Sequence, residues 1–321
     1  MNKKIKTIDL FAGIGGIRLG FEQAFNEDIE TVFASEWDRH ARETYKANFM
    51  DGLEIAGDIT KIREKDIPEF DVCLAGFPCQ AFSIAGKRKG FDDTRGTLFF
   101  DVARICGYHK PKVIFCENVK GLLWHEKGKT YKIIKDTIEG MGYTIHDKVL
   151  NSKDFGVPQN RERIFVAAFR NDIDTSSFVF PEPTDSGKRI RDIMEKLPVD
   201  AKYYLNETLL ESMKKYKAKK IKNGFTYEVR DYNGVASTVM CDNAGRTKNL
   251  LVDDRLKDLP PGKNAENIRK MTPREFARLQ GFPDGFILPV SDSQLYKQFG
   301  NTVTVPVIKA VAENIRRVLC R

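Results

Sequence analysis

The chain has 321 residues, of which 41% are hydrophobic and 31% charged, a composition typical of a globular protein with one large or two smaller domains. No apolar stretch is long enough to cross a bilayer, and the apolar run behind the basic start is too short for a signal peptide, so we expect a soluble cytoplasmic protein. The formal net charge of +8, concentrated in residues 211–230, favours a polyanionic partner, although a solvated helix face carries similar lysine runs.

In the first half of the chain, short apolar runs alternate with helix-length segments. We predict strands over residues 5–11, 31–36, 71–76, 113–117, 143–150 and 163–169, and helices over residues 14–25, 38–48, 98–108 and 129–141. Strands that alternate with helices predict an α/β fold with a mostly parallel sheet that helices cover on both faces.

The pattern changes after Arg170. Residues 171–190 are rich in Pro, Gly, Ser and Asp, which predicts a linker, and residues 190–270 lose the alternation. We interpret residues 190–270 as a smaller second domain with short strands such as 234–240. Thr272, Pro273 and Glu275 form the signature of a helix start with a capping box. A final amphipathic helix over residues 304–319 has the spacing that packs on a sheet.

Six cysteines occur, and none forms a CxxC pair or lies near a histidine at zinc-ligand spacing. We therefore expect neither a metal site nor a disulfide framework. Cys73 and Cys116 lie in apolar strand-like runs and are expected to be buried. Cys79 differs, because it follows Pro78 in a loop at the end of a predicted strand, where parallel-sheet enzymes carry catalytic groups.

A glycine-rich turn, residues 9–16, joins the first predicted strand to the first predicted helix. Such a turn lets a cofactor approach the backbone and the helix N-terminus. A dinucleotide fingerprint would require glycine where the chain has Arg18, so a pyrophosphate site fits poorly. Glu36 and Trp37 end the second strand, where they suit a ribose and an adenine ring, and Asp58 suits an adenine amino group. Solvated or core roles for these three residues are the alternatives.

Two further polar groups lie at strand ends. Glu117 follows a buried strand and can bond the amino edge of a pyrimidine, and an arginine from residues 159–163 can bind a carbonyl oxygen. A structural ion pair between Glu117 and Arg163 is the alternative reading.

Six segments together resemble the DNA (cytosine-5) methyltransferase family of restriction–modification systems. They are FAGIGG, GFPCQ, ENV, QNRERIF, MTPREFARLQGFP and QFGNTVTVP, in the order and near the spacing of the family's motifs. The resemblance covers residues 1–170 and 270–321. It implies a Rossmann-like methyltransferase domain over residues 1–180 and 295–321, and a target-recognition domain with its hinge over residues 181–294.

The resemblance implies a mechanism through Cys79, which would attack carbon 6 of a flipped-out cytosine in duplex DNA. Glu117 would bond the amino group and ring nitrogen 3, and Arg163 would hold the base carbonyl with Arg161 beside it. The methyl group of S-adenosylmethionine would then move to carbon 5, giving S-adenosylhomocysteine, with no metal involved. A monomer suffices for this chemistry, and a cognate restriction endonuclease would share the system.

The resemblance also implies two sets of binding residues. For the cofactor they are Phe11, Gly13, Ile14, Gly15, Gly16, Glu36, Trp37, Asp58, Ile59, Pro78, Leu98, Asn301 and Val303. For DNA they are Gln80, Ser83, Lys87, Arg88, Lys89, Arg95 and Thr238, which include a segment that resembles the loop that closes over DNA in this family. Arg230 and Arg246 are candidates to read guanine edges, and phosphate binding is the equally common alternative for an arginine. Position 85 is Ala, whereas some members carry a polar residue there that fills the gap left by the flipped base.

Three other functions remain open from the sequence. A tRNA cytosine methyltransferase has a similar architecture, although Gly76-Phe77 and the long middle domain argue against it. An inactive DNA-binding regulator would not need Cys79, Glu117 and Arg163. A nicotinamide oxidoreductase is disfavoured by the missing third glycine. Labelled methyl transfer and cofactor-binding assays discriminate among these functions.

Overall fold

The computed structural model describes residues 4–78, 98–184, 186–218, 227–241, 247–256 and 258–320. The chain forms two compact units, which we describe separately. Unit 1 contains residues 1–150, 162–183 and 307–321, and unit 2 contains residues 151–161 and 184–306. These limits differ from the expected domain boundaries near 180 and 295, because residues 151–161 and 295–306 pack with unit 2. No described helix is long and apolar enough to cross a membrane.

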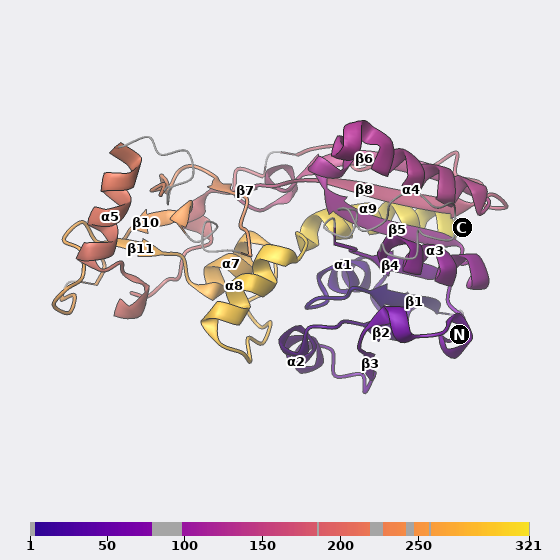
Figure 1. The fold of residues 1–321 in the computed structure, drawn as a ribbon, viewed down its shortest axis with the longest axis horizontal. Coiled ribbons are helices and arrows are strands. Elements are labelled where there is room, and N and C mark those ends of the chain that lie inside the picture. Colours follow the sequence, from indigo (N-terminus) through magenta and orange to yellow (C-terminus); the bar gives the residue numbers. More distant parts are fainter. Residues whose placement is uncertain are drawn as a thin grey trace. The chain divides into compact units, whose positions relative to one another are not determined.

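Unit 1 is built on a sheet in which seven described strands follow the order β3-β2-β1-β4-β5-β8-β6 (Figure 1). Their bounds are β1 Ile5–Leu10, β2 Ile29–Ser35, β3 Ile55–Ala56, β4 Val72–Ala75, β5 Val113–Val119, β6 Tyr143–Asn151 and β8 Glu162–Arg170. The pairs β2–β3, β1–β2, β1–β4 and β4–β5 are parallel, whereas β5 and β8 are antiparallel. The predicted α/β fold with a mostly parallel sheet is confirmed.

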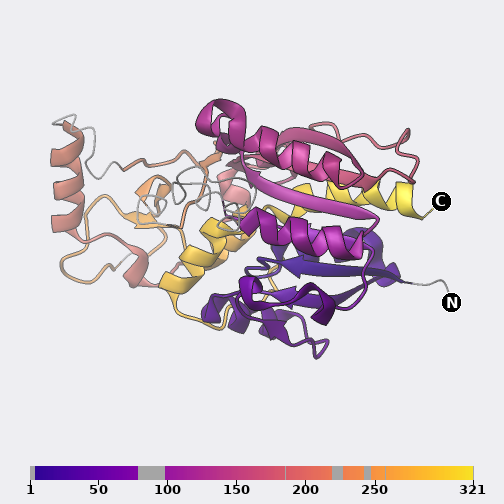
Figure 2. The ribbon, with the colours of Figure 1, turned by 45° about the vertical axis from the view of Figure 1, so that its right-hand side comes forward.

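Helices cover both faces of this sheet (Figures 1 and 2). They are α1 Gly16–Phe25, α2 Arg39–Asn48, α3 Leu98–His109, α4 Lys129–Gly140 and α9 Val305–Leu319. Side chains of β5 alternate between the two faces, as a strand requires. Phe115 meets Phe21 of α1 with ring centroids 5.1 Å apart, whereas Ile114 and Cys116 join the cluster formed by α3 and α4. Cys73 and Cys116 are buried, as predicted.

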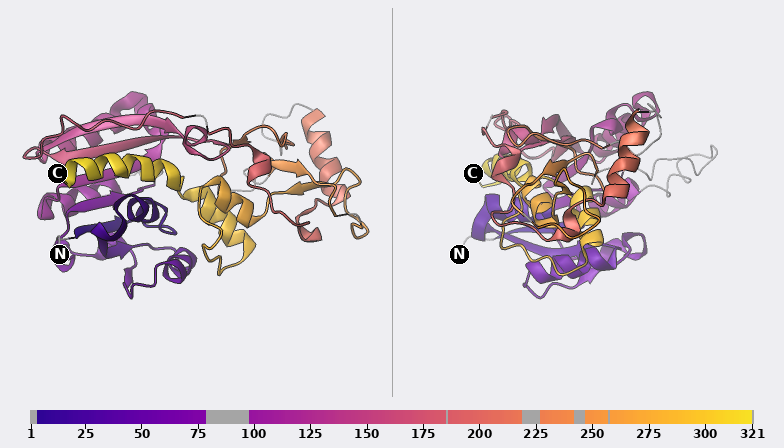
Figure 3. Two further views of the ribbon diagram at one scale, coloured as in Figure 1. Left: turned by 180° about the vertical axis from the view of Figure 1, so that it is seen from behind. Right: turned by 90° about the vertical axis from the view of Figure 1, so that its left-hand side faces the viewer.

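The final helix, α9, returns along the sheet beside α1, as seen from behind in Figure 3. Its apolar residues Val307, Ile308, Val311 and Ile315 are buried, which confirms the predicted amphipathic packing. A Cβ atom on Gly20 of α1 would lie 2.5 Å from Ile308, so the absence of a side chain at Gly20 allows the two helices to approach this closely.

Unit 2 has less regular structure. Its described strands are β7 Gln159–Asn160, β9 Ala236–Ser237, β10 Leu250–Val252 and β11 Ile268–Lys270, and its described α-helices are α5 Glu207–Ala218, α7 Pro273–Leu279 and α8 Asp292–Asn301. Two-stranded pairs form between β7 and β9 and between β10 and β11. Across both units, short 3-10 helices lie at Asn26–Asp28, Ile59–Lys61, Glu64–Asp66, Lys120–Leu123, His125–Gly128, Ser152–Phe155, Ile190–Asp192 and Ala201–Tyr203.

A buried ion-pair network stabilises unit 2 around the start of α7. Thr272 and Glu275 form the predicted capping box. Arg269, which is fully buried, bonds both oxygens of Glu275 and one oxygen of Asp253 at 2.7–2.8 Å. Burial opposes ionisation of Asp253, but hydrogen bonds from Arg255 and Arg269 outweigh it and lower the Asp253 pKa to about 2. Asp253 is therefore ionised at neutral pH.

The predicted strand over residues 234–240 is much shorter in the structure. Only Ala236–Ser237 pairs with a neighbouring strand. Beyond Ser237 the backbone bonds to side chains instead of to a ladder, because Val239 N–H donates to Gln159 Oε1 and Val239 C=O accepts from Arg161. The alternating pattern of the sequence does not show whether the backbone of a segment bonds to a neighbouring strand or to side chains.

Candidate active site

The carboxyl ends of four neighbouring strands in unit 1 form the candidate site. Strands β2, β1, β4 and β5 lie side by side and parallel, so their carboxyl ends meet at one edge of the sheet. This edge carries the glycine turn after β1, Glu36 after β2, Pro78 after β4 and Glu117 near the end of β5. Ligands of open parallel sheets bind at such edges.

The glycine turn has a backbone that few residue types adopt. Phe11, Gly13 and Gly15 all have positive φ angles, of 56°, 56° and 82°. A Cβ atom on Gly15 would lie 2.2 Å from the ring of Phe49, so a side chain there would clash. A Cβ atom on Gly13 would meet no described atom within 4 Å, so the turn is open at Gly13. An open glycine at a strand-to-helix turn suits close approach of a cofactor.

The Glu36 side chain is hydrogen-bonded to this turn. Its Oε2 accepts from Gly13 N–H at 2.8 Å, and its Oε1 accepts from Asp38 N–H at 2.8 Å. Burial raises the Glu36 pKa, and these two amide donors oppose that shift. Each carboxylate oxygen has a second lone pair, so Glu36 retains the capacity to accept from two ribose hydroxyls.

The other expected cofactor residues differ in exposure. The Trp37 side chain is 81% exposed, which leaves its ring face open for stacking. Asp58 is also accessible, and hydrogen bonds from Thr60 lower its pKa. Pro78 is exposed, and Leu98 is half-buried at the start of α3. Ile14 and Ile59, in contrast, are buried in the core, so their backbone atoms are the parts that remain for a ligand.

A buried carboxyl group, Asp9, lies below the glycine turn at the end of β1. Its Oδ2 accepts from the Tyr45 hydroxyl at 3.4 Å, and its Oδ1 has no hydrogen-bond partner among the described residues. Burial raises the pKa of Asp9 to about 7, against the opposing charge of Arg18. The sequence pattern gave Asp9 no role, because its burial depends on α2 packing over the strand.

Asp9 predicts a pH-dependent stability. In the unfolded chain its pKa is 3.8, so between pH 3.8 and about 7 the folded protein holds the extra proton. Stability linked to Asp9 is therefore full below pH 4 and is lost as the pH rises through 7, by about 4 kcal/mol at roughly 1.4 kcal/mol per pKa unit. Asp9→Asn, neutral at every pH, is expected to unfold at higher urea than the wild type at pH 8.5. Equal pH dependence in both proteins contradicts this, and Asp136→Asn on the exposed face of α4 is the control.

Glu117 and Arg163 form a pair at the same sheet edge. Antiparallel pairing of β5 with β8 sets Glu117 opposite Phe165 and Val119 opposite Arg163. Arg163 Nε lies 3.3 Å from Glu117 Oε1, and the two side chains are only 15% and 11% exposed. Burial lowers the Arg163 pKa, and the charge of Glu117 opposes that shift. The sequence predicted both residues as base ligands, and the structure brings them together.

Asn118 contributes a contact that the sequence did not predict. Its Nδ2 donates to Phe77 C=O at 2.8 Å, and both side chains are buried. Phe77 precedes Pro78 and Cys79, so Asn118 fixes the backbone two residues before the expected nucleophile. Asn118 belongs to the ENV segment, in which the sequence predicted a function for Glu117 alone.

Several expected site residues belong to unit 2. Arg161 is buried and donates to three backbone carbonyls, and Thr238 donates to Asn160 C=O at 2.7 Å. Arg230 bonds Lys248 C=O at 2.9 Å and also contacts Glu228 and Ser237. Asn301, at the end of α8, is exposed, and Val303 is buried. The remaining predictions, Cys79, Gln80, Ser83, Lys87, Arg88, Lys89, Arg95 and Arg246, lie outside the described residues.

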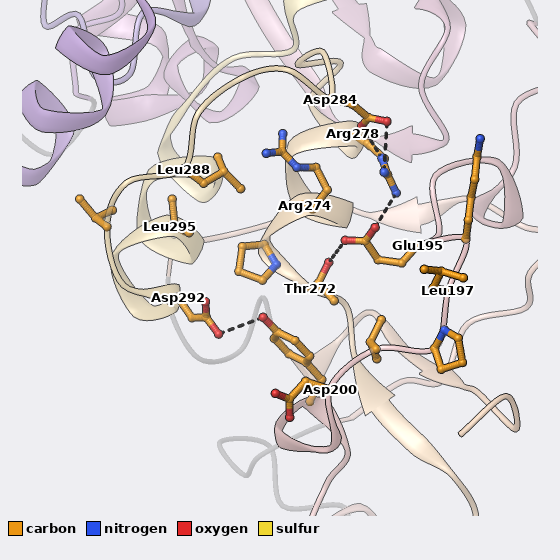
Figure 4. Close-up of a pocket in the computed structure, with 16 residues that line it drawn as sticks. Glu195, Leu197, Asp200, Thr272, Arg274, Arg278, Asp284, Leu288, Asp292 and Leu295 are labelled. Carbon is orange, nitrogen blue, oxygen red and sulfur yellow. Dashed lines mark hydrogen bonds and ion pairs between the residues drawn. The ribbon is translucent and has the colours of Figure 1, made fainter. Parts of the chain in front are cut away.

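Unit 2 also has a pocket of about 630 Å³ that contains none of these residues (Figure 4). Arg278 crosses one side of it to Asp284 at 2.7 Å and to Glu195 at 3.3 Å, and Tyr203 bonds Asp292 at 3.0 Å. Three of its charged groups, those of Arg278, Asp284 and Glu195, are thus paired with one another. The pocket adds no group to the candidate chemistry.

Comparisons with known proteins identify the family of the chain. A family model described as C-5 cytosine-specific DNA methylase matches residues 5–317. The Type II methyltransferase M.HpaII of Haemophilus parainfluenzae is 49% identical over 98% of this chain and 90% of its own length. The Type II methyltransferase M.NlaX of Neisseria lactamica is 47% identical over 98% of this chain and 97% of its own length.

Solved structures share the fold at lower identity. The Dnmt2 methyltransferase of S. pombe superposes with a TM-score of 0.77 at 22% identity, over 98% of this chain and 99% of its own. A putative DNA modification methyltransferase from an E. coli prophage gives a TM-score of 0.72 at 23% identity, over 99% of this chain and 100% of its own. With the family match over nearly the whole sequence, these findings show that the chain belongs to the C-5 cytosine-specific DNA methylase family.

Proposed function

We propose that this enzyme transfers a methyl group from S-adenosylmethionine to carbon 5 of a flipped-out cytosine in a specific duplex DNA sequence. The observation that carries the proposal is the buried pair of Glu117 and Arg163 at the sheet edge. Asn118, beside Glu117, bonds the backbone that leads into Cys79. The carboxyl group of Glu117, the guanidinium of Arg163 and the thiol of Cys79 would thus all act on one cytosine ring.

Cys79 is proposed to attack first. Carbon 5 of cytosine is a poor nucleophile, and addition of the Cys79 thiolate at carbon 6 turns it into an enamine carbon. Glu117 bonds the exocyclic amino group and, in its protonated form, gives its proton to ring nitrogen 3, which takes up the electron pair displaced by the addition. Glu117 takes this proton back when the ring becomes aromatic again. Arg163 donates to the base carbonyl oxygen. After methylation, loss of the carbon 5 proton to solvent expels Cys79 and restores the free thiolate.

S-adenosylmethionine supplies the methyl group as an electrophile on its sulfonium. The open turn at Gly13, the buried acceptor Glu36 and the exposed ring of Trp37 fit an amino acid, a ribose and an adenine in turn. Asp58 would accept from the adenine amino group. The family resemblance adds Asn301 and Val303 of unit 2 to this set.

Unit 2 is proposed to recognise the target sequence. The family resemblance assigns the segment around Thr238 to recognition. Arg230 and Arg246 are proposed to contact the DNA as well, either at guanine edges or at phosphates. Extraction of the cytosine from the duplex costs a few kcal/mol, which contacts with the DNA backbone must offset. Lysines and arginines in residues 80–95 would provide part of them.

We further propose that the enzyme protects bacterial or phage-borne DNA in a restriction–modification system, acting in the cytoplasm as a monomer. The Type II methyltransferases of Haemophilus parainfluenzae and Neisseria lactamica support this role. A cognate endonuclease would be its functional partner, without need for direct contact.

Expression in a host that lacks cytosine methylation, followed by base-resolution sequencing, tests the function. We expect 5-methylcytosine at one position of one short duplex sequence throughout the genome. The Cys79→Ala protein, expressed to the same level, is the control for background signal. Genomes free of 5-methylcytosine, with folded wild-type protein present, contradict the proposal.

A further inference from the structure

We propose that Arg161 is a positioning residue that couples the recognition segment, residues 237–239, to the cofactor segment, residues 299–304. The inference rests on the proposed function, which assigns Thr238 to recognition and Asn301 and Val303 to the cofactor. It also gives Arg161 a different task from Arg163, two residues later. All of the contacts involved lie within unit 2.

The recognition segment is held from one side by three consecutive residues. Gln159 Oε1 accepts from Val239 N–H at 2.9 Å, and Arg161 Nη1 donates to Val239 C=O at 2.9 Å. Between them, Asn160 C=O accepts from the Thr238 hydroxyl at 2.7 Å. Strand β7 pairs in parallel with β9, which includes the first residue of this segment. The position of Thr238 is thus determined by residues 159–161.

The same guanidinium holds the cofactor segment. Arg161 Nη2 donates to Gly300 C=O at 3.2 Å and to Thr302 C=O at 2.7 Å. These two carbonyls flank Asn301, so the backbone on both sides of that residue is fixed by one side chain. The guanidinium of Arg161 therefore bonds both the recognition segment and the cofactor segment.

Neither end of this link has room to move independently. Arg161 is only 2% exposed. A Cβ atom on Gly300 would lie 2.2 Å from the backbone nitrogen of Cys241, so the cofactor segment packs against the backbone that directly follows the recognition segment. Arg161 itself is anchored, because its N–H donates to Asn151 Oδ1 at 3.0 Å and its C=O accepts from Ser152.

A second buried chain of hydrogen bonds runs parallel to this link. Gln280 Nε2 donates to Phe299 C=O at 2.7 Å, and Gln280 Oε1 accepts from Gln159 and from the Thr304 hydroxyl. The Thr304 hydroxyl also lies 2.7 Å from Ser152 Oγ. Networks of this kind have few alternative arrangements, because each buried polar group that loses a partner costs free energy.

Coupling follows from this arrangement. A ligand that favours one position of the 300–302 backbone also favours one position of the Arg161 guanidinium, and hence of Val239 and Thr238. By linkage, cofactor and target DNA then change each other's affinity by the same factor. A residue that only stabilised the fold would lower the melting temperature of unit 2 and leave this factor unchanged.

Arg161→Lys tests the coupling. A lysine ammonium keeps the charge but is a single point, so it cannot span carbonyls of both segments as a planar guanidinium does. Arg255→Lys is the matched control, since Arg255 bonds Glu195 C=O and the Asp253 carboxylate within unit 2, and these partners belong to neither segment. Both variants are checked by circular dichroism and thermal unfolding.

The probes are S-adenosylhomocysteine and a duplex that carries the sequence found by base-resolution sequencing, with single-base-changed duplexes beside it. In the wild type, S-adenosylhomocysteine is expected to tighten binding of the cognate duplex. In Arg161→Lys, the factor by which S-adenosylhomocysteine tightens DNA binding is expected to fall about tenfold. The ratio of affinities for the cognate and the changed duplexes is expected to fall by about the same amount, which is the scale of one or two charged hydrogen bonds. Arg255→Lys is expected to keep both.

Two results overturn the inference. One is an Arg161→Lys protein that loses thermal stability as Arg255→Lys does but keeps both the coupling factor and the discrimination. The other is a wild-type protein whose DNA affinity does not respond to S-adenosylhomocysteine. Methylation at the cognate site, together with a DNA affinity that does not respond to S-adenosylhomocysteine, overturns the inference alone. A folded wild-type protein that binds S-adenosylhomocysteine but methylates no cytosine contradicts the proposed function on which the inference rests, so the two failures are distinguishable.

Discussion

Replacement of Cys79 by alanine is expected to abolish methyl transfer while binding of S-adenosylmethionine persists. Without thiolate addition at carbon 6, carbon 5 keeps the low nucleophilicity of an aromatic pyrimidine. We expect kcat to fall about 10⁴-fold or more, the scale that follows removal of a covalent nucleophile. Incorporation of labelled methyl groups into duplex DNA measures turnover, and calorimetry measures cofactor affinity.

The matched control for this change is Cys241→Ala. Cys241 is an exposed free cysteine of unit 2 with no assigned role, so its loss is expected to leave turnover within twofold of the wild type, about what a neutral surface substitution allows. Retention of wild-type turnover in Cys79→Ala would falsify the nucleophile assignment. A trapped adduct between wild-type protein and DNA that contains 5-fluorocytosine, absent from Cys79→Ala, would support it further.

The second large effect is expected for Glu117→Gln. A glutamine can still accept from the amino group of cytosine, but it cannot protonate ring nitrogen 3 or balance the buried charge of Arg163. Stabilisation of the charge that develops during thiolate addition is therefore lost. We expect kcat to fall about 10²- to 10³-fold, as when one preorganised polar contact to a transition state is removed. Single-turnover methylation separates this loss from slower product release.

Glu162→Gln provides the comparison for Glu117→Gln. Glu162 begins β8 next to Arg163, but its carboxylate pairs with Lys120 at 3.0 Å near the surface. An exposed pair of this kind contributes little, so kcat is expected to change less than threefold. If Glu117→Gln methylates at a rate within a factor of three of Glu162→Gln, Glu117 is not the group that activates the base.

Much of unit 1 follows from local sequence signals. Apolar runs of strand length and the amphipathic spacing of α9 predicted its elements, because burial on one face leaves a periodic record in the sequence. The capping box at Thr272 and Glu275 was equally readable, since its two hydrogen bonds join residues three positions apart. The motif order predicted that Glu117 and Arg163 share a site, and their 3.3 Å contact agrees.

The sequence could not separate Arg161 from Arg163. In one continuous strand these residues would lie on the same face, two positions apart. The structure ends β7 at Asn160 and begins β8 at Glu162, and the two strands belong to different sheets, so Arg161 lies at a break between them. Arg163 meets Glu117, whereas Arg161 turns to carbonyls of residues 239, 300 and 302. These contacts join residues up to 141 positions apart, which no local pattern records.

Asp9 and Asn118 were missed for a related reason. Each belongs to a motif in which a neighbour had an evident role, and each acts through a distant partner. Asp9 depends on Tyr45, which comes from α2, and Asn118 depends on Phe77, which follows β4. Polar residues at strand ends are common in parallel sheets. Only the contacts seen in the folded structure show whether such a residue positions a neighbouring segment or is simply exposed to solvent.

The central claim is that this chain methylates carbon 5 of cytosine in duplex DNA. The most direct test incubates purified protein with S-adenosylmethionine labelled in its methyl group and with equal amounts of duplex DNA or tRNA. The nucleic acids are then digested to nucleosides and separated. We predict label in 5-methyldeoxycytidine from the duplex and none above background from tRNA. Label confined to tRNA, or label in a base other than 5-methylcytosine, would contradict the account.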